Sequence, residues 1–299
     1  MNNEKVSIVI PARNEQFLQN TIRSMLENAR GQIEIIVVLD GYWPNPQIEE
    51  DGRVIFIHRS EPQGMRPAIN AAVAIARGKY VLKADAHCLF PVGFDLALKA
   101  DCEKNWVVVP RRHRLDPQNW CIQDTGKPPI DYMYLSYPDD PKDFGGPGLN
   151  GKVWDELNRR EDLKKDLITD LMSFQGSAWF MHRDYFYDLE LMDDKNYGSF
   201  WNEAQEIGLK AWLSGGRVVR NKKTWYAHLH KGKTYGRGYH LAENLLKQGA
   251  QYTHKWLTNT AWHKQTKPLS WLIERFWPVP GWPEERKLWN FDKSTDAAT

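Results

Sequence analysis

The chain has 299 residues, of which 41% are hydrophobic and 26% charged, and its formal net charge is +2. This composition is ordinary for a globular protein and excludes a disordered or low-complexity chain. Cys88, Cys102 and Cys121 cannot all pair and show no CxxC spacing, so neither a disulfide framework nor a zinc ribbon is indicated.

The N-terminal segment MNNEKVSIVIPARNE lacks the basic, apolar and small-residue layout of a signal peptide. No stretch approaches the roughly 18 consecutive apolar residues that a membrane span requires. We therefore expect a cytoplasmic protein, or one in the host cytoplasm if the source is a virus.

Strands and helices alternate in the first part of the chain. Strands are predicted at residues 6–11, 33–39, 54–58, 80–84 and 106–110, and helices at 15–30 and 67–76. This alternation predicts an α/β fold with a mainly parallel sheet and helices on both faces, in which ligands bind at the carboxyl ends of strands. Asp40 and Asp85 both lie at such ends.

The pattern dissolves into Pro, Gly and Asp between residues 116 and 166, which predicts a long active-site or acceptor loop. Order returns with residues 174–181, a helix at 203–213 and a strand at 217–220.

Charge and tryptophan are unevenly distributed along the chain. Residues 217–299 contain 15 Lys and Arg against 6 Asp and Glu, and hold 7 of the 14 Trp. This asymmetry predicts a basic, Trp-rich C-terminal tail. We expect a main domain over residues 1–235 and a helical extension over residues 236–299.

The predicted strand at 80–84 is followed by the motif Asp85-Ala86-His87. Residues two apart on an extended segment point to the same side, so Asp85 and His87 can converge on one cation. A carboxylate combined with an imidazole suits Mn²⁺ better than Mg²⁺, which prefers oxygen ligands. Alone, this motif is weak evidence, because an Asp and a His near a strand end are common.

Six segments over residues 5–235 strengthen this interpretation: VSIVIPARNE, VVLDG, ARGKYVLKADAHC, GSAWFMHRDYF, NEAQEIGLKAWLSGG and WYAHLHK. In this order they resemble the GT-A glycosyltransferases of family 2 and, more pointedly, the polypeptide N-acetylgalactosaminyltransferases. The resemblance implies a Rossmann-like GT-A fold and a metal-dependent glycosyltransferase. Such an enzyme moves a sugar from a nucleotide-sugar, with UDP as the expected carrier, to a hydroxyl acceptor.

The resemblance also implies which residues bind the metal and which contact the nucleotide. His228 becomes the third ligand of Mn²⁺ or Mg²⁺, although His230 lies on the same side and the two could be exchanged. The implied nucleotide contacts are Pro11, Arg13, Asn14, Glu15, Asp40, Arg66, Ala84 and Asp85. Asp40 could instead be a turn residue before Gly41, and Arg66 a solvated residue at a helix start.

The helix at 203–213 carries two candidate catalytic residues, Glu203 and Glu206. Glu203 matches the acidic residue that the family places near the acceptor and the reacting sugar. Inverting members commonly have an aspartate base at the next position, where this chain has Ala204. Glu203 could serve as the base itself, but together with the DxH motif and the later histidine the resemblance favours transfer with retention. The spacing of Glu206 and Lys210 favours a surface ion pair.

The segment HKGKTYGRGYH reads as a flexible basic lid. Lys231, Lys233 and Tyr235 are expected to close on the diphosphate of the donor and to exclude water. The alternative is a solvated surface loop.

The acceptor is less defined by the sequence. The basic, Trp-rich extension is compatible with DNA, so hydroxymethylated bases of phage-type DNA are one candidate acceptor, and a glycan, glycolipid or protein is another. The tryptophans can equally pack helices onto the main domain. A sugar-nucleotide pyrophosphorylase and a noncatalytic sugar-nucleotide binding protein remain as alternatives.

Overall fold

The computed structural model describes residues 4–138, 148–240 and 242–289. The strands of its main sheet are β1 (Val6–Ala12), β2 (Ile33–Asp40), β3 (Val54–Arg59), β4 (Tyr80–Ala84), β5 (Cys88–Leu89), β6 (Trp106–Asp116), β7 (Cys121–Ile122), β10 (Ile168–Asp170), β11 (Ala178–His182) and β12 (Arg217–His228). Two further strands, β8 (Met133–Leu135) and β9 (Gly151–Val153), form a small antiparallel pair.

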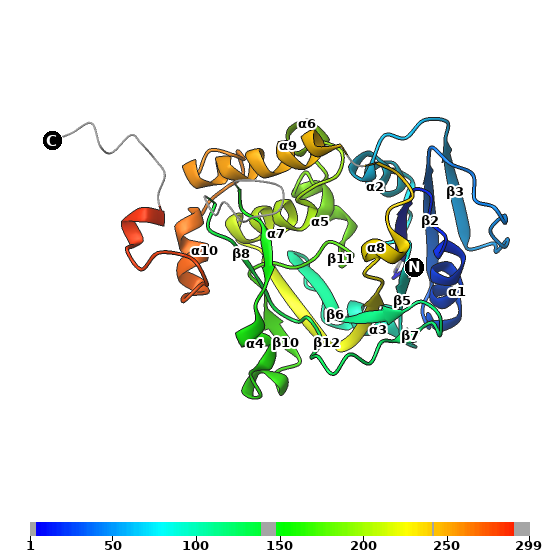
Figure 1. Cartoon of the computed structure of the whole chain (residues 1–299), viewed down its shortest axis with the longest axis horizontal. Coiled ribbons are helices and arrows are strands. Elements are labelled where there is room, and N and C mark those ends of the chain that lie inside the picture. Colours follow the sequence, from blue (N-terminus) through cyan, green and yellow to red (C-terminus); the bar gives the residue numbers. More distant parts are fainter. Residues whose placement is uncertain (1–3, 139–147, 241, 290–299) are drawn as a thin grey trace.

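The main sheet has the order β10-β12-β6-β11-β4-β1-β2-β3, with β5 added to β12 and β7 to β6 (Figure 1). Neighbours β4, β1, β2 and β3 are parallel, as are β6 and β12. Strand β11 runs antiparallel between β4 and β6. The sheet is therefore mixed but mainly parallel, as the sequence predicts.

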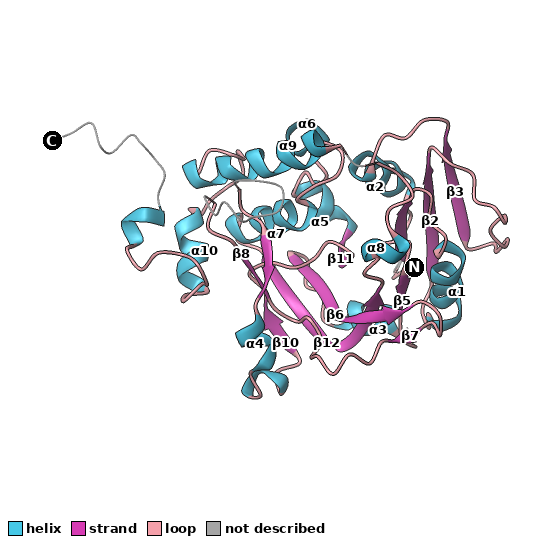
Figure 2. Ribbon diagram, in the orientation of Figure 1, coloured by secondary structure: helices cyan, strands magenta, loops and turns pink. Residues whose placement is uncertain are grey.

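The helices surround this sheet (Figure 2). They are α1 (Leu18–Asn28), α2 (Met65–Ile75), α3 (Phe94–Ala100), α4 (Asp155–Arg159), α5 (Arg183–Asp188), α6 (Asp194–Tyr197), α7 (Glu203–Leu213), α8 (Gly232–Tyr235), α9 (Glu243–His254) and α10 (Leu269–Arg275), with short 3₁₀ helices at Asp162–Lys164, Lys255–Thr258 and Arg286–Trp289.

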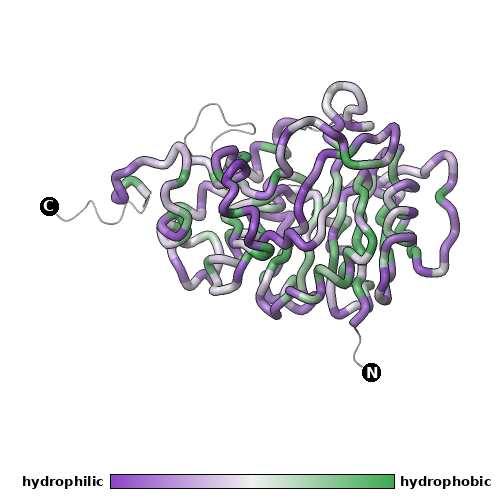
Figure 3. Tube along the Cα trace, turned by 90° about the horizontal axis from the view of Figure 1, so that it is seen from below, coloured by the Kyte–Doolittle hydropathy of each residue, from purple (hydrophilic) through white to green (hydrophobic). Residues whose placement is uncertain are grey.

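Alternate residues of the buried strands pack on opposite layers of helices. In β2, Ile35 and Val37 join the apolar cluster that contains α1 and α3, whereas Ile36 and Val38 join the cluster that contains α2, α5 and α7. Each fully buried side chain of this size contributes about 1.5–3 kcal/mol. Figure 3 shows the hydrophobic residues concentrated along these central strands. The predicted α/β sandwich is confirmed.

Several boundaries differ from the sequence-based expectations. Strand β12 continues from Arg217 to His228 because a register shift between Asn221 and Trp225 carries it past a polar stretch. Strand β6 likewise runs beyond Pro110 to Asp116. Helix α2 begins at Met65, so Pro67 is its third residue rather than its first. The expected loop at 116–166 contains the short elements β7, β8, β9 and α4.

The C-terminal segment packs against the α7 side of the sheet. Trp256, Trp262, Trp282 and Trp289 are buried in the same apolar cluster as α7, and Trp271 and Trp277 are partly buried against it. Thus the described part of this segment uses its tryptophans for packing. The domain boundary at residue 235 stays a prediction. None of the helices within residues 4–138, 148–240 and 242–289 has the length and apolarity needed to cross a bilayer.

Candidate active site

A cavity of about 1180 Å³ opens where several strands of the main sheet end. Its lining includes Pro11 and Asp40 from the ends of β1 and β2, Asp85 directly after β4, and His228 at the end of β12. Glu203, the first residue of α7, lines it as well. The ends of the strands thus gather polar side chains from distant parts of the chain, as expected for an open α/β sheet.

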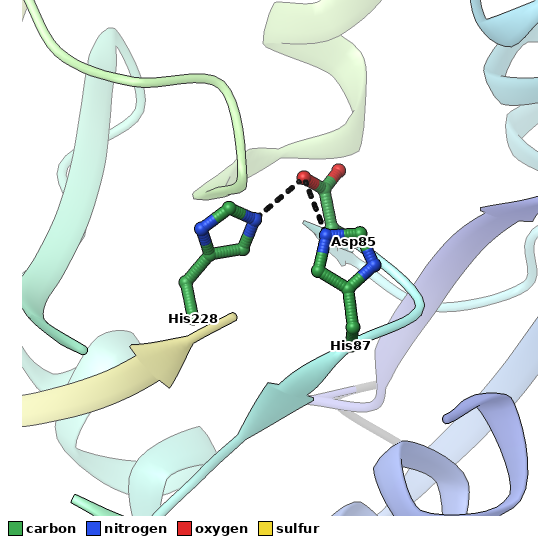
Figure 4. A group of neighbouring side chains, drawn as sticks. All are labelled: Asp85, His87 and His228. Carbon is green, nitrogen blue, oxygen red and sulfur yellow. Dashed lines mark hydrogen bonds and ion pairs between the residues drawn. The ribbon is translucent and has the colours of Figure 1, made fainter. Parts of the chain in front are cut away.

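Asp85, His87 and His228 form the candidate metal group. Figure 4 shows their side chains pointing toward one another from two segments, the β4–β5 turn and the end of β12. The Nε2 atom of His228 lies 3.1 Å from Asp85 Oδ2, and Nε2 of His87 lies 4.0 Å from the same oxygen. One potential ligand atom from each residue lies within 4.8 Å of the other two. This spacing is short enough for the three to share one cation.

The electrostatics of the candidate metal group suit a divalent ion. Burial lowers the pKa of His228 to about 3, so its imidazole is neutral, as a metal ligand must be. Burial alone would raise the pKa of Asp85, but the Lys83 ammonium and the bond from His228 hold it well below its usual range. The ionised carboxylate of Asp85, the neutral imidazole of His228 and the imidazole of His87 form a donor set typical of Mn²⁺.

Glu15 orients His87 within this group. Its Oε2 atom lies 3.2 Å from His87 Nδ1, and its Oε1 accepts a bond from Lys231. Because a carboxylate only accepts, a neutral His87 keeps its proton on Nδ1 and presents the lone pair of Nε2. The structure therefore places Glu15 behind the candidate metal ligand.

His230 takes a different position from His228. Its Nε2 atom lies 3.0 Å from Nη2 of Arg112, and its ring centroid is 6.2 Å from that of His228. Among the described residues, only His228 joins Asp85 and His87 at ligand spacing. The geometry thus favours His228 over His230 as the third ligand.

Lys83 links the candidate metal group to Glu203. This fully buried lysine of β4 donates to Asp85 Oδ1 at 2.6 Å, to Glu203 Oε2 at 3.2 Å and to the carbonyl of Gly176 at 2.7 Å. Glu203 Oε1 also accepts from Nε1 of Trp179 at 2.7 Å. Burial raises the pKa of Glu203, although Lys83 opposes this effect. Lys83 is not among the residues predicted from the sequence, although a charged residue inside the apolar strand YVLKA is a detectable signal.

Asp40 lies at the cavity wall with its carboxylate fully engaged. Oδ1 accepts from Arg59 and from the backbone of Gln63, and Oδ2 accepts from the backbone N–H of Gly64. It is only 3% exposed. Asp40 therefore fixes the loop before α2 as well as facing the expected nucleotide side of the cavity.

The segment after β12 closes against the β1 loop. Asn14 Nδ2 donates to the carbonyl of Gly238 at 2.6 Å, and the guanidinium of Arg13 lies 4.3 Å from the ring centroid of Tyr239. Lys231 lines the cavity, whereas Asn14 does not. This arrangement matches the position expected for a lid.

Tyr235 and Lys233 are the other two residues predicted to lie in the lid. Tyr235 does not line the cavity; its ring packs edge-on against Phe17 at 5.5 Å, so the prediction of a diphosphate contact is not met in this arrangement. Tyr239, four residues later in the chain, lines the cavity instead. Lys233 lies in α8, and its side chain is outside the described part of the chain.

Arg66 and Glu206 are also placed differently from the expectation. Both are fully buried and form an ion pair with each other, and Glu206 Oε1 accepts from Lys210 at 2.8 Å. The predicted pair of Glu206 with Lys210 therefore exists, but in the interior rather than on the surface. Neither Arg66 nor Glu206 lines the cavity. They stabilise the interior below it instead of contacting a nucleotide or a sugar. Ala84 is likewise buried within β4 and does not line the cavity.

Comparisons with known proteins give this geometry a family. Residues 7–189, more than half of the chain, match the model of glycosyl transferase family 2. The chain belongs to this family. The expectation of a family 2 glycosyltransferase is thereby confirmed.

Two curated relatives agree with the family match. The chain is 25% identical over 240 residues to putative polypeptide N-acetylgalactosaminyltransferase 13 of Drosophila melanogaster, covering 71% of this chain and 39% of that protein. It is 31% identical over 127 residues to an uncharacterized glycosyltransferase of Methanocaldococcus jannaschii, covering 39% of this chain and 41% of that protein. The chain thus spans about two fifths of the length of these relatives.

A solved structure supports the fold. The crystal structure of GalNAc-T7 with UDP, GalNAc and Mn²⁺ superposes with a TM-score of 0.68, covering 92% of this chain and 57% of that chain at 17% identity. The GT-A fold predicted from the sequence is therefore confirmed.

Proposed function

We propose that this chain transfers a sugar from a UDP-sugar to a hydroxyl acceptor, with retention at the anomeric carbon, and that a divalent ion held by Asp85, His87 and His228 is required. The observation that carries the proposal is the convergence of these three side chains within 4.8 Å, although His228 is 141 residues from His87 in the chain. The family match and the Mn²⁺ and UDP named for the GalNAc-T7 structure support it.

Each part of the cavity has a role in this proposal. The ion, when bound, neutralises the negative charge that develops on the departing diphosphate. Asp40 and the loop after β1, which contains Arg13, face the nucleotide on the side of the sheet formed by β1 and β2. Lys231 adds positive charge beside the diphosphate, and the lid that contains it excludes water.

The cavity carboxylates support retention. Glu203 accepts from Trp179 and Lys83, Glu15 is bonded to His87 and Lys231, and Asp40 is bonded to Arg59 and two backbone amides. Asp85 is assigned to the metal. Among the described cavity residues, each carboxylate therefore already has a partner, and Ala204 supplies no base.

The bond changes follow from this arrangement. The bond between the sugar C1 and the diphosphate oxygen breaks, and a bond from the acceptor oxygen to C1 forms on the same face. The proton of the acceptor hydroxyl passes to the departing diphosphate. Glu203 orients the sugar by accepting a hydrogen bond rather than by removing this proton.

The C-terminal tryptophans bear on the class of acceptor. The six C-terminal tryptophans are buried or partly buried, so within the described residues they supply no exposed stacking surface for bases. Hydroxymethylated DNA stays a hypothesis that depends on the basic charge of the segment alone. An assay of hydroxymethylated DNA beside glycans and peptides as acceptors tests this hypothesis.

The test is a panel of sugar nucleotides with Mn²⁺, scored for released UDP, with hydroxymethylated duplex DNA, unmodified DNA, glycans and peptides as acceptors. We expect turnover that is lost with EDTA and in Asp85→Asn, and kept in His263→Ala, a variant of an exposed histidine outside the cavity. Nuclear magnetic resonance of the product should show the anomeric configuration of the donor. Turnover that resists EDTA would contradict the metal requirement, and an inverted product would contradict retention.

A further inference from the structure

Three arginine side chains of the described residues are buried, and one differs from the others. Arg66 pairs with Glu206, and Arg220 donates to the carbonyl of Asp131 at 2.9 Å and lies 3.9 Å from its carboxylate. Arg112, which is 4% exposed, has no carboxylate within 4.0 Å among the described residues. Its charge is therefore buried without a protein anion beside it.

The side chain of Arg112 has a single partner in the described structure. Its Nη2 donates to Nε2 of His230 at 3.0 Å. A guanidinium carries five N–H donors, and because it can only donate, His230 Nε2 must be the acceptor. His230 thus orients the guanidinium but contributes no negative charge, and most of the donors of Arg112 remain available to a ligand.

Arg112 faces the same cavity as the candidate metal group. It lines the cavity together with His228 and His230. It lies in β6, opposite Tyr226 of the neighbouring β12. In the sheet order, β11 and β4 separate β6 from β1 and β2, whose ends carry the expected nucleotide contacts. In that order β6 also lies between β12, which ends at His228, and β4, which leads to Asp85, so Arg112 lies on the metal side of the cavity, away from the expected nucleotide contacts of β1 and β2.

The free-energy cost of burying a charge indicates that Arg112 lacks an anionic partner. An unpaired buried ion costs several kcal/mol, and protein sites normally offset that cost with an opposite charge. Burial lowers the pKa of Arg112, and the neighbouring Arg114 adds to this effect. The carboxylates of the cavity are bonded elsewhere and Asp85 acts on Arg112 only from beyond 4.0 Å, so we infer that a ligand supplies the anion in direct contact. A guanidinium fork matches the oxygens of phosphate in a two-point contact.

We propose that Arg112, oriented by His230, binds a phosphate group of the acceptor beside the hydroxyl that receives the sugar. The proposal rests on the proposed function of the same cavity and assigns the acceptor to a phosphate-bearing class. The donor diphosphate is the other possible source of such a group, and the experiment separates the two.

The first measurement is the binding of inorganic phosphate to the metal-free chain by isothermal titration calorimetry. Arg112→Gln should bind phosphate at least about tenfold more weakly than the wild type, because a charge-assisted contact is lost. Arg53→Gln, which alters an exposed arginine in the β2–β3 loop, should bind phosphate as the wild type does. Equal binding by Arg112→Gln and the wild type, or no binding by the wild type, would overturn the proposal.

The second measurement is the affinity of the same variants for UDP in the presence of Mn²⁺. We expect Arg112→Gln to stay within about twofold of the wild type, since the expected nucleotide contacts come from β1 and β2, which β11 and β4 separate from β6. A loss of tenfold or more would assign Arg112 to the donor diphosphate and overturn the acceptor assignment. If Arg112→Gln does not fold by circular dichroism, Arg112→Lys replaces it, because lysine keeps the charge but loses the fork; its phosphate affinity should be lower than that of the wild type, and an equal affinity would overturn the proposal.

The two proposals fail in different ways. If the wild type binds phosphate through Arg112 but shows no Mn²⁺-dependent binding of UDP, the proposed function fails while the anion site stands. If UDP binds and sugar transfer proceeds but phosphate binding is independent of Arg112, only the anion site fails.

Discussion

Glu203 and Glu206 lie one helical turn apart on α7, yet they belong to two different charge clusters. The cavity cluster consists of Lys83, Asp85 and Glu203, and the core cluster consists of Arg66, Glu206 and Lys210. The cavity cluster joins two carboxylates to one buried cation and the core cluster joins one carboxylate to two, and only the cavity cluster reaches the cavity. The comparison shows that equal spacing on a helix does not imply equal roles.

The surroundings of the two glutamates explain the difference. Glu203 lies against Gly176, where a Cβ atom would come within 2.5 Å of its Oε2 and would displace the carboxylate. Glu206 is enclosed by Arg66, Lys210 and the backbone N–H of Asp193. Glu203 can exchange one of its partners for a ligand in the cavity, whereas Glu206 is enclosed and has no access to the cavity.

The largest expected effect concerns the core cluster. Glu206→Ala leaves Arg66 and Lys210 buried without their carboxylate, and we expect the free energy of unfolding to fall by about 3–5 kcal/mol. Urea denaturation measures this loss. A fall of less than about 1 kcal/mol would mean that the two cations find other partners, and the core cluster would lose its structural role.

A smaller effect is expected at Lys83. Lys83→Met leaves two carboxylates facing each other, and because Asp85 is 26% exposed we expect a loss of only about 2 kcal/mol without metal. Mn²⁺ should restore part of that stability, and should raise the melting temperature of Lys83→Met more than that of the wild type. An equal rise in both proteins would show that Lys83 is independent of the metal site.

The next effect separates the clusters by activity. Glu203→Gln keeps the shape but removes a charged acceptor, and we expect turnover per folded molecule to fall about 10–100-fold. Glu206→Gln, the matched variant one turn away, should retain turnover within about threefold once corrected for the folded fraction. The opposite ranking would assign the catalytic role to the core cluster.

The smallest effect is the pH dependence of stability. The cations of the core cluster lower the pKa of Glu206 below 4.5 against the effect of burial, so its contribution is present above that value and is lost as the pH falls through the folded pKa. Burial raises the pKa of Glu203 above 4.5, so its penalty grows as the pH rises above 4.5 and is complete above the folded pKa.

Urea denaturation between about pH 3.5 and 7 should therefore separate the two variants. The stability lost in Glu206→Gln relative to the wild type should shrink toward low pH. Glu203→Gln should become relatively more stable than the wild type as the pH rises. Parallel profiles for the two variants would contradict the assigned environments.

The sequence predicts the strands of the sheet well, because runs such as IEIIVVL are apolar on both faces. It also predicts Asp85 and His87, which share one turn. It cannot bring His228 to them without a family resemblance, because tertiary pairing of β12 with β5 and β6 creates that contact.

The misplaced predictions have a common physical cause. Arg66, Glu206 and Tyr235 are polar residues near the expected site in sequence, and spacing alone does not report whether a side chain points into the cavity or the core. Arg112 was overlooked because a charged residue after Pro110 reads as the end of a strand, whereas β6 continues through it.

The most direct test of the metal site is Mn²⁺ binding followed by electron paramagnetic resonance, which reports free and bound ion separately. We expect one tightly bound Mn²⁺ per wild-type chain in the presence of UDP. That binding should be lost in Asp85→Ala, His87→Ala and His228→Ala, and kept in His230→Ala. Undiminished Mn²⁺ binding by His228→Ala, or its loss in His230→Ala instead, would contradict the account.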